Sequence, residues 1–503
     1  MKAFLMYRNR DFDLEAELPV NQRSLIQDLE LNTLFNAMSL GDEFLFEVAK
    51  KAVLTGLKDD TDTILYRQSV LKDCLKNSST VINIYNTVFE AIENERKNFW
   101  GIFATKSPES ILNRSVTVLE MFLAAIKTLK NIAGDCSEKF DSEGFSALFC
   151  MLKKEFCDEY FNSIQDHLRE LNFKNGILLS AELGRGNTGV NYVLRKSNIK
   201  KQKFFERIFA KGPQTITHYV HERDECGHRM LAEIKDRGLN LVANALAQST
   251  DHILGFLKML RIELAFYIGC LNLHKQLISM DAPVSFPNPQ PCSSRSHQFS
   301  GLYDISLALT KKQKVVGNDI SAQNKLFVII TGANQGGKST FLRSIGQSQL
   351  MMQCGMFVPA QHFSSNLCDN LFTHFKREED TDMKSGKFDE ELARMDDIVN
   401  NITSGTMILF NESFAATNER EGSEIARQIT SALYEKNIKV FFVTHLFEFA
   451  NGLSGKMMEN ALFLRAQRQD NGERTFRLIE GEPLQTSFGE DLYKKIFNES
   501  GNT

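Results

Sequence analysis

The sequence is poor in features that mark cross-linked, metal-binding or membrane-inserted proteins. Its nine cysteines never fall in a C-x-x-C pair, so neither a zinc site nor a disulfide framework is indicated, and scattered thiols suit a reducing compartment. No uninterrupted apolar stretch reaches the roughly 18 residues of a transmembrane helix, and the apolar start, residues 1–7, is too short for a signal peptide. We therefore expect a cytoplasmic protein with no membrane partner.

An excess of positive charge is also absent. The chain has 59 Lys and Arg residues against 63 Asp and Glu residues, for a formal net charge of −4. This balance excludes a global attraction to nucleic acid, so any such contact must come from a local basic patch. With 503 residues, 42% of them hydrophobic, the chain is long enough to bury two or more cores. We therefore expect a multidomain protein.

Proline is scarce, and its distribution divides the chain. Four of the nine prolines lie within residues 283–291 and are followed by a serine-rich stretch, a composition typical of a semi-rigid linker. We therefore expect a helical domain over residues 1–282, a linker over residues 283–300 and a second domain over residues 301–503. Apolar residues at three- and four-residue steps over residues 253–271 predict one long amphipathic helix that leads into the linker.

Glycines concentrate in one part of the helical domain. Gly184, Gly186 and Gly189 interrupt two apolar stretches, which predicts a small β insertion within residues 175–220. A basic segment with three phenylalanines follows directly, and its cations are Arg195, Lys196, Lys200, Lys201, Lys203, Arg207 and Lys211. This segment is either a contact for the DNA backbone or a solvated loop. A backbone contact would make binding salt-dependent, with little base selectivity.

The most informative segment is residues 326–340, where an apolar strand runs into Gly332-x4-Gly337-Lys338-Ser339. This is the spacing of a phosphate-binding loop. Glycines let consecutive backbone N–H groups face the phosphates, the lysine neutralises the β- and γ-oxygens, and the serine ligates Mg²⁺. The alternative, an accidental glycine-rich turn, is disfavoured because an apolar strand precedes the loop and an amphipathic segment typical of a helix start follows it. We predict a nucleoside triphosphate site formed by Gly332, Ala333, Asn334, Gln335, Gly336, Gly337, Lys338, Ser339 and Thr340.

Two further apolar strands end in residues typical of hydrolysis. The strand at residues 406–410 ends in Asn411-Glu412. In ATPases with this loop, an acidic residue at the first position holds the Mg²⁺ shell, and a glutamate at the second activates the attacking water. Asn411 offers only a neutral oxygen to a metal-bound water, so we expect weaker Mg²⁺ binding, with Glu412 as the base. The strand at residues 440–444 delivers His445 to the same edge. A lone histidine there is more often a structural cap, but this position favours a γ-phosphate sensor.

These motifs together resemble the ATPase domain of the MutS family of DNA mismatch-repair proteins. The matching segments, in chain order, are Asn318-Asp319-Ile320, Thr331 to Thr340, Phe357-Val358-Pro359-Ala360, Asn411-Glu412 with Thr417 and Gly422, Thr444-His445, and Thr486-Ser487-Phe488-Gly489. The resemblance implies a C-terminal α/β P-loop domain of the ABC-like kind that uses ATP and Mg²⁺. It also implies that Asn334, Lys338 and Ser339 handle phosphates and Mg²⁺, Glu412 serves hydrolysis and His445 senses the nucleotide state.

The same resemblance, weaker over residues 31–75, implies that the helical domain is the family's core and lever. The basic segment would then lie at the lever tip, where the family's clamp touches DNA. It also implies a homodimer in which Ser385, Gly386 and Lys387 reach the partner's nucleotide. Typical members have a second serine where this chain has Phe388, so the contact across the dimer falls to Ser385 or Lys387 or is missing. Partners in repair or recombination are also expected.

The expected function is an ATP-dependent DNA-binding switch, acting on specific DNA structures or nonspecifically. Lever-like sequence begins near Leu31, so we expect no built-in mismatch reading. A scaffold that hydrolyses ATP slowly or not at all is the alternative. Asn411 and Phe388 favour this scaffold, whereas Lys338, Ser339, Glu412 and His445 favour hydrolysis. A chromosome-maintenance ATPase of the long-coiled-coil type is disfavoured because no sustained heptad repeat occurs.

Overall fold

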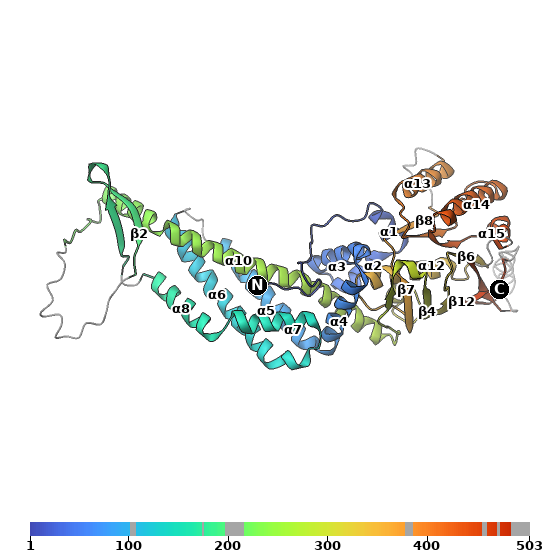
Figure 1. Cartoon of the computed structure of the whole chain (residues 1–503), viewed down its shortest axis with the longest axis horizontal. Coiled ribbons are helices and arrows are strands. Elements are labelled where there is room, and N and C mark those ends of the chain that lie inside the picture. Colours follow the sequence, from blue (N-terminus) through green and yellow to red (C-terminus); the bar gives the residue numbers. More distant parts are fainter. Residues whose placement is uncertain are drawn as a thin grey trace, which may run out of the picture. The chain divides into compact units, whose positions relative to one another are not determined.

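The computed structural model describes residues 1–100, 107–173, 176–196, 216–377, 386–454, 460–469 and 473–483 (Figure 1). These residues form two compact units. The first comprises Met1–Ala3, Ile82–Glu138 and Ser146–Arg261, and the second comprises Phe4–Val81, Lys139–Phe145 and the described residues from Ile262 onward. Within the described ranges, no helix is both long enough and apolar enough to cross a lipid bilayer.

The first unit is built mainly of helices. It contains all of α6 (Pro108–Cys136) and α8 (Asp158–Leu171), most of α5 (Ser78–Trp100) and α7 (Glu143–Glu155), and the N-terminal part of α10 (Glu225–Ser279). Ser107 starts α6 because its side chain accepts the backbone N–H of Ser110, and Pro108 suits the first turn. The 55-residue helix α10 confirms the long helix predicted over residues 253–271.

A β-hairpin completes the first unit. β1 (Leu179–Leu183) and β2 (Gly189–Leu194) pair antiparallel, and the short 3-10 helix η3 (Arg185–Asn187) joins them. The hairpin lies against α10, where Gly238 leaves space for Leu179. A Cβ at position 238 would come within 2.4 Å of a methyl carbon of Leu179. This hairpin confirms the small β element predicted within residues 175–220.

A six-stranded sheet lies in the second unit. In spatial order its strands are β12 (Arg474–Glu480), β11 (Ala461–Arg468), β6 (Phe327–Gly332), β10 (Lys439–Val443), β9 (Thr406–Asn411) and β8 (Asn370–Phe375). Neighbouring strands run parallel except for β11 and β12, which are antiparallel. Parallel strands are covered on both faces, which is why the sequence shows unbroken apolar runs at β6, β9 and β10.

Four helices alternate with these strands: α12 (Lys338–Gln353), α13 (Lys387–Asn401), α14 (Glu419–Glu435) and α15 (Phe447–Ser454). One apolar core joins Phe410 of β9 and Phe442 of β10 to side chains of α14 and α15, including Leu433 and Phe449. The rings of Phe410 and Phe442 stack with their centroids 4.7 Å apart. This core fixes the positions of β9 and β10, and with them the positions of the residues at the ends of these strands.

A second sheet corrects the predicted linker. Residues 283–300 include β3 (Asn288–Gln290) and most of β4 (His297–Leu302), which pair with β7 (His362–Asn366), and β5 (Asn318–Ser321) pairs with β4. Pro289 fits within β3 because β3 is an edge strand, where proline costs no interior ladder bond. The segment also bonds elsewhere, since the side chain of Gln68 donates to the carbonyl oxygen of Pro287. It is structured sheet and not a spacer.

The N-terminal helices lie in the same unit as the sheets. They are α1 (Gln22–Asp28), α2 (Leu31–Ser39), α3 (Glu43–Thr55), η1 (Gly56–Lys58) and α4 (Thr61–Lys76), and α11 (Ile305–Lys311) packs on α2. Helix α12 packs closely against this N-terminal segment. Gln347 donates to the carbonyl oxygen of Leu29 at 2.9 Å, and a Cβ on Gly346 would lie 2.7 Å from a methyl carbon of Leu29. The proline pattern predicted a boundary at residue 282. The compact units do not divide there.

Candidate functional site

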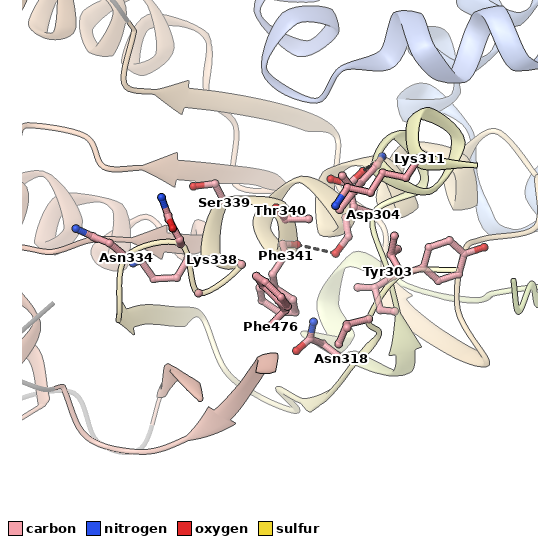
Figure 2. A pocket seen from close by; sticks show the side chains of 18 of the residues that line it. Tyr303, Asp304, Lys311, Asn318, Asn334, Lys338, Ser339, Thr340, Phe341 and Phe476 are labelled. Atoms are coloured by element: carbon pink, nitrogen blue, oxygen red, sulfur yellow. Dashed lines mark hydrogen bonds between the residues drawn. The ribbon is translucent and has the colours of Figure 1, made fainter. Parts of the chain in front are cut away.

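A cavity of about 890 Å³ lies at the carboxyl end of the six-stranded sheet, the edge at which open α/β sheets bind ligands. In Figure 2, Asn334, Lys338 and Ser339 lie on one side of the cavity, and Tyr303 and Lys311 lie on the other. Glu412 and His445 also line the cavity, together with the start of α12. The structure thus brings most of the predicted nucleotide and catalytic residues to one space.

The loop between β6 and α12 depends on its glycines for close approach to β11. Gly332 has φ +105°, and a Cβ there would lie 2.8 Å from the backbone nitrogen of Ala466. A Cβ on Gly336 would lie 2.6 Å from the Cβ of Ala466. Helix α12 begins directly after the loop at Lys338, so its unpaired first-turn N–H groups point to the cavity end. The N-terminus of such a helix attracts anions.

Lys338 is nearly buried and folded onto its own loop. Its Nζ donates to the carbonyl oxygens of Gly332 at 2.9 Å and Ala333 at 3.0 Å. Burial lowers the pKa of Lys338, while the carboxylate of Glu412 acts in the opposite direction. An anion entering the cavity would favour the charged ammonium and offset this burial. The ammonium of Lys338 is therefore held where a phosphate oxygen could accept a further hydrogen bond and balance its charge.

Ser339 lines the cavity and contacts Asn411, which is not itself among the lining residues. The hydroxyl of Ser339 donates to Oδ1 of Asn411 at 2.9 Å. Asn411 is the last residue of β9, and its carbonyl oxygen accepts the N–H of Lys376 at 2.9 Å. A serine hydroxyl and an amide oxygen are hard donors of the type that Mg²⁺ accepts directly or through its waters, so this pair fits a hydrated Mg²⁺.

Glu412 is held in an unusual backbone conformation. Its φ is +54°, in the left-handed region, which costs an L-residue about 1–2 kcal/mol. Its N–H donates to the carbonyl oxygen of Val443 at 2.9 Å, and Thr444 donates to the carbonyl oxygen of Ile330 at 3.0 Å. These bonds align the ends of β9, β10 and β6. Strain of this kind is common at functional residues, where the surroundings enforce it.

The sequence analysis missed several residues that line the cavity. Phe476 of β12 is half exposed, has φ +59°, and lies 3.5 Å from the position of a Cβ on Gly337. Tyr303, Lys311 and Lys376 also contribute. Nothing in the spacing of Phe476 or Tyr303 points to the loop. Lys376 directly follows the buried strand β8 as Glu412 follows β9, but the polar residues within β8 hide the strand in the sequence.

The other predicted residues lie elsewhere or outside the described ranges. Arg195 donates to the hydroxyl of Ser180 at 2.8 Å, and Lys196 pairs with Glu170 at 2.7 Å. Gly386 is the N-cap of α13 and Lys387 is its first residue, and neither is among the residues lining the cavity. The predicted residues that lie outside the described ranges are Lys200, Lys201, Lys203, Arg207, Lys211, Ser385 and Thr486 to Gly489.

The architecture defines a helix-rich protein with mixed sheets and a loop-and-helix cavity at a parallel sheet edge. Comparison with known proteins names the family. The model of the MutS2 N-terminal domain matches residues 59–280, and the model of MutS domain V matches residues 328–497. The chain belongs to the MutS family. This confirms the family resemblance noted in the sequence.

Individual relatives match parts of the chain. The DNA mismatch repair protein MutS of Prochlorococcus marinus is 26% identical over 302 residues, which is 57% of this chain and 32% of that protein. The protein of the same name from Thermotoga maritima is 38% identical over 171 residues, 34% of this chain and 22% of that protein. The human MutS protein homolog 4 is 29% identical over 151 residues, 30% of this chain and 16% of that protein. The chain thus spans about a third or less of the length of these relatives.

Proposed function

We propose that this protein is an ATP-dependent DNA-binding switch that binds ATP with Mg²⁺ in the cavity and hydrolyses it. The observation that carries the proposal is the meeting of four predicted groups in one place: the loop N–H groups, Lys338, the Ser339–Asn411 pair and Glu412. A cavity with phosphate-binding groups at one end and aromatic groups at the other suits a nucleotide. Phe341 and Phe476 supply apolar surface toward the side of Tyr303, where a base would lie (Figure 2).

In this mechanism the P-loop backbone and Lys338 hold the β- and γ-phosphates. Mg²⁺, held through Ser339 and Asn411, would screen the phosphate charge. Glu412, on its strained turn, accepts a proton from the attacking water as the water forms its bond to the γ-phosphorus, and ADP leaves. His445, at the end of β10, lies at the same edge to sense the γ-phosphate. Two copies of the chain would complete each other's sites through Ser385, Gly386 and Lys387.

The helical part is proposed to serve as core and lever, with the hairpin and the basic segment as a clamp. Helix α10 is one continuous element of 55 residues, and a stiff helix can transmit a movement driven by nucleotide. The names of the relatives, DNA mismatch repair protein MutS among them, support action on DNA and association with repair proteins. A weakly hydrolysing scaffold remains the second candidate, because Asn411 presents an amide where a carboxylate would hold the metal shell.

The deciding experiment measures ATP turnover of the purified protein without DNA and with duplex, branched or single-stranded DNA. Stimulation by one form supports the switch, and turnover that no DNA changes supports the scaffold. A triple change of Lys200, Lys201 and Lys203 to Glu should weaken DNA binding. It should also make the log–log salt slope shallower by about 0.9 per lost phosphate contact. An unchanged slope and affinity would show that the basic segment does not bind DNA.

A further inference from the structure

A buried polar cluster lies directly under the loop that carries Glu412. We call it the His374 cluster, and it consists of His374 from β8, Ser413 from the loop after β9, and Glu391 from α13. The side chains of His374 and Ser413 are fully buried, and that of Glu391 is 4% exposed. None of the three is among the residues that line the cavity. The cluster therefore reaches the cavity through neighbouring residues, of which Glu412 directly precedes Ser413.

The hydrogen bonds assign the protons within the cluster. Nε2 of His374 lies 2.9 Å from the carbonyl oxygen of Glu391, which can only accept, so Nε2 carries a proton. Burial lowers the pKa of His374 to about 4, and the ring is therefore neutral near pH 7. Nδ1 must then accept the hydroxyl proton of Ser413 at 2.7 Å. The same hydroxyl lies 2.5 Å from the carbonyl oxygen of His374 and is shared between the two acceptors.

The cluster also holds the residue that follows Ser413. Oε2 of Glu391 accepts the backbone N–H of Phe414 at 3.1 Å, and the Phe414 ring stacks on His374 with centroids 5.3 Å apart. Phe414 has φ +62° and Glu412 has φ +54°, so left-handed residues stand on both sides of Ser413. A turn with two such residues relaxes unless outside contacts enforce it. Here those contacts come from β8 and α13.

We propose that His374, Ser413 and Glu391 are positioning residues that hold Glu412 in its hydrolytic place and tie its loop to α13. The proposal rests on the proposed function. Glu391 belongs to α13, which begins at Lys387 directly after its N-cap Gly386. The cluster therefore links the loop of Glu412 to the helix that starts at the proposed partner contact. If the cluster only stabilises the fold, its loss lowers stability without a specific loss of kcat.

Ser365 offers a matched control for Ser413. Both serines are fully buried, and each hydroxyl oxygen lies 2.7 Å from Nδ1 of a buried histidine, His297 in the case of Ser365. Ser365 belongs to β7 in the four-stranded sheet and does not line the cavity. Each hydroxyl also donates to a second oxygen, Oε1 of Gln349 for Ser365 and the carbonyl oxygen of His374 for Ser413. The two Ser→Ala changes thus each remove a buried hydroxyl bonded to a histidine ring, at two places of which only one adjoins Glu412.

The test measures kcat, KM for ATP, affinity for a non-hydrolysable ATP analogue and melting temperature for the parent, Ser413→Ala and Ser365→Ala. We expect Ser413→Ala to lower kcat by about tenfold or more while KM and analogue affinity stay within about twofold, since a displaced base slows only the chemical step. Ser365→Ala should lower the melting temperature by an amount similar to that of Ser413→Ala and should keep the kcat of the parent. In a second pair, Glu391→Gln keeps an oxygen acceptor for Phe414 and should retain most of the turnover that Glu391→Ala loses.

Each other outcome has one meaning. Parent kcat in Ser413→Ala, or equal kcat losses in Ser413→Ala and Ser365→Ala, overturns the positioning role and leaves the proposed function in place. Equal losses in Glu391→Gln and Glu391→Ala overturn the tie to α13. The proposed function itself is overturned if the parent protein does not hydrolyse ATP, or if its hydrolysis persists in Lys338→Ala. The positioning role is then overturned with it.

Discussion

The two sheets of the second unit hold polar groups in opposite settings. At the carboxyl edge of the six-stranded sheet, Lys338, Glu412 and His445 border an open cavity. In the four-stranded sheet, His297 and Ser365 are sealed from solvent. Lys439, from the opposite end of β10, is buried in the same polar interior, where Nζ donates to the side-chain oxygen of Asn366 at 2.8 Å.

Burial alone does not separate the two settings. It lowers the pKa of Lys439 to about 7 and also lowers the pKa values of His297 and Lys338. What separates them is what surrounds each group. Lys338 lines the cavity of about 890 Å³ together with Glu412 and His445, whereas Lys439 borders a smaller cavity of about 370 Å³ at the opposite end of β10 and His297 lines neither. A shifted pKa therefore indicates a candidate site only where the group shares a cavity with other groups that can act on a ligand. The predictions below test this contrast, from the largest expected effect to the smallest.

The largest effect is expected at the cavity edge. Glu412→Gln should leave ATP binding intact and lower kcat by about 10²- to 10⁴-fold, because only the proton transfer from water is lost. Lys338→Ala should instead remove nucleotide binding, since it takes away ground-state charge on the phosphates. Single-turnover hydrolysis and equilibrium titration with a fluorescent ATP analogue separate the two. Turnover of Glu412→Gln at the parent rate would exclude Glu412 as the base.

Lys439 should affect stability and not chemistry. Its native pKa of about 7 lies below the ordinary value of 10.5, so between these pH values the unfolded chain binds one more proton than the native chain. Stability then rises with pH through this window, by about 1.4 kcal/mol per pH unit, and below it both states are protonated. Lys439→Met should remove this slope. Urea unfolding of parent and variant at pH 7, 8 and 9 measures it, with ATP turnover as the control.

Two results would contradict this expectation for Lys439. Equal pH slopes in parent and Lys439→Met would mean that the native lysine does not lose its proton in this range. A large loss of turnover in the variant, beyond its change in stability, would mean that the four-stranded sheet contributes to the chemistry after all.

The smallest effect is expected from Asn411→Asp. A carboxylate holds a hydrated cation more strongly than an amide does, so the Mg²⁺ concentration for half-maximal turnover should fall several-fold. Ser339 is the partner at 2.9 Å, and Ser339→Ala should shift the Mg²⁺ dependence the other way. An identical Mg²⁺ dependence in parent and Asn411→Asp would show that position 411 does not act on the metal.

Much of the second unit was predictable because its signals are local. The apolar runs at β6, β9 and β10 reflect burial on both faces, and each run ends where the sheet meets the cavity. Since parallel strands share one edge, the residues after them meet there, which is why Glu412 and His445 were found from sequence. In the first unit, the glycines of the hairpin are equally local signals, and so is the three- and four-residue spacing of apolar residues in α10.

The sequence alone determined the helices, the buried strands and the glycine loop with its lysine, because periodicity and backbone freedom are properties of neighbouring residues. Only the tertiary structure decided that residues 288–302 are sheet and not linker, and that residues 4–81 pack with the C-terminal part. It alone brought Phe476 to the loop and joined His374, Ser413 and Glu391. These contacts join residues far apart in the chain, and their energy comes from shared burial and hydrogen bonding that no local pattern records.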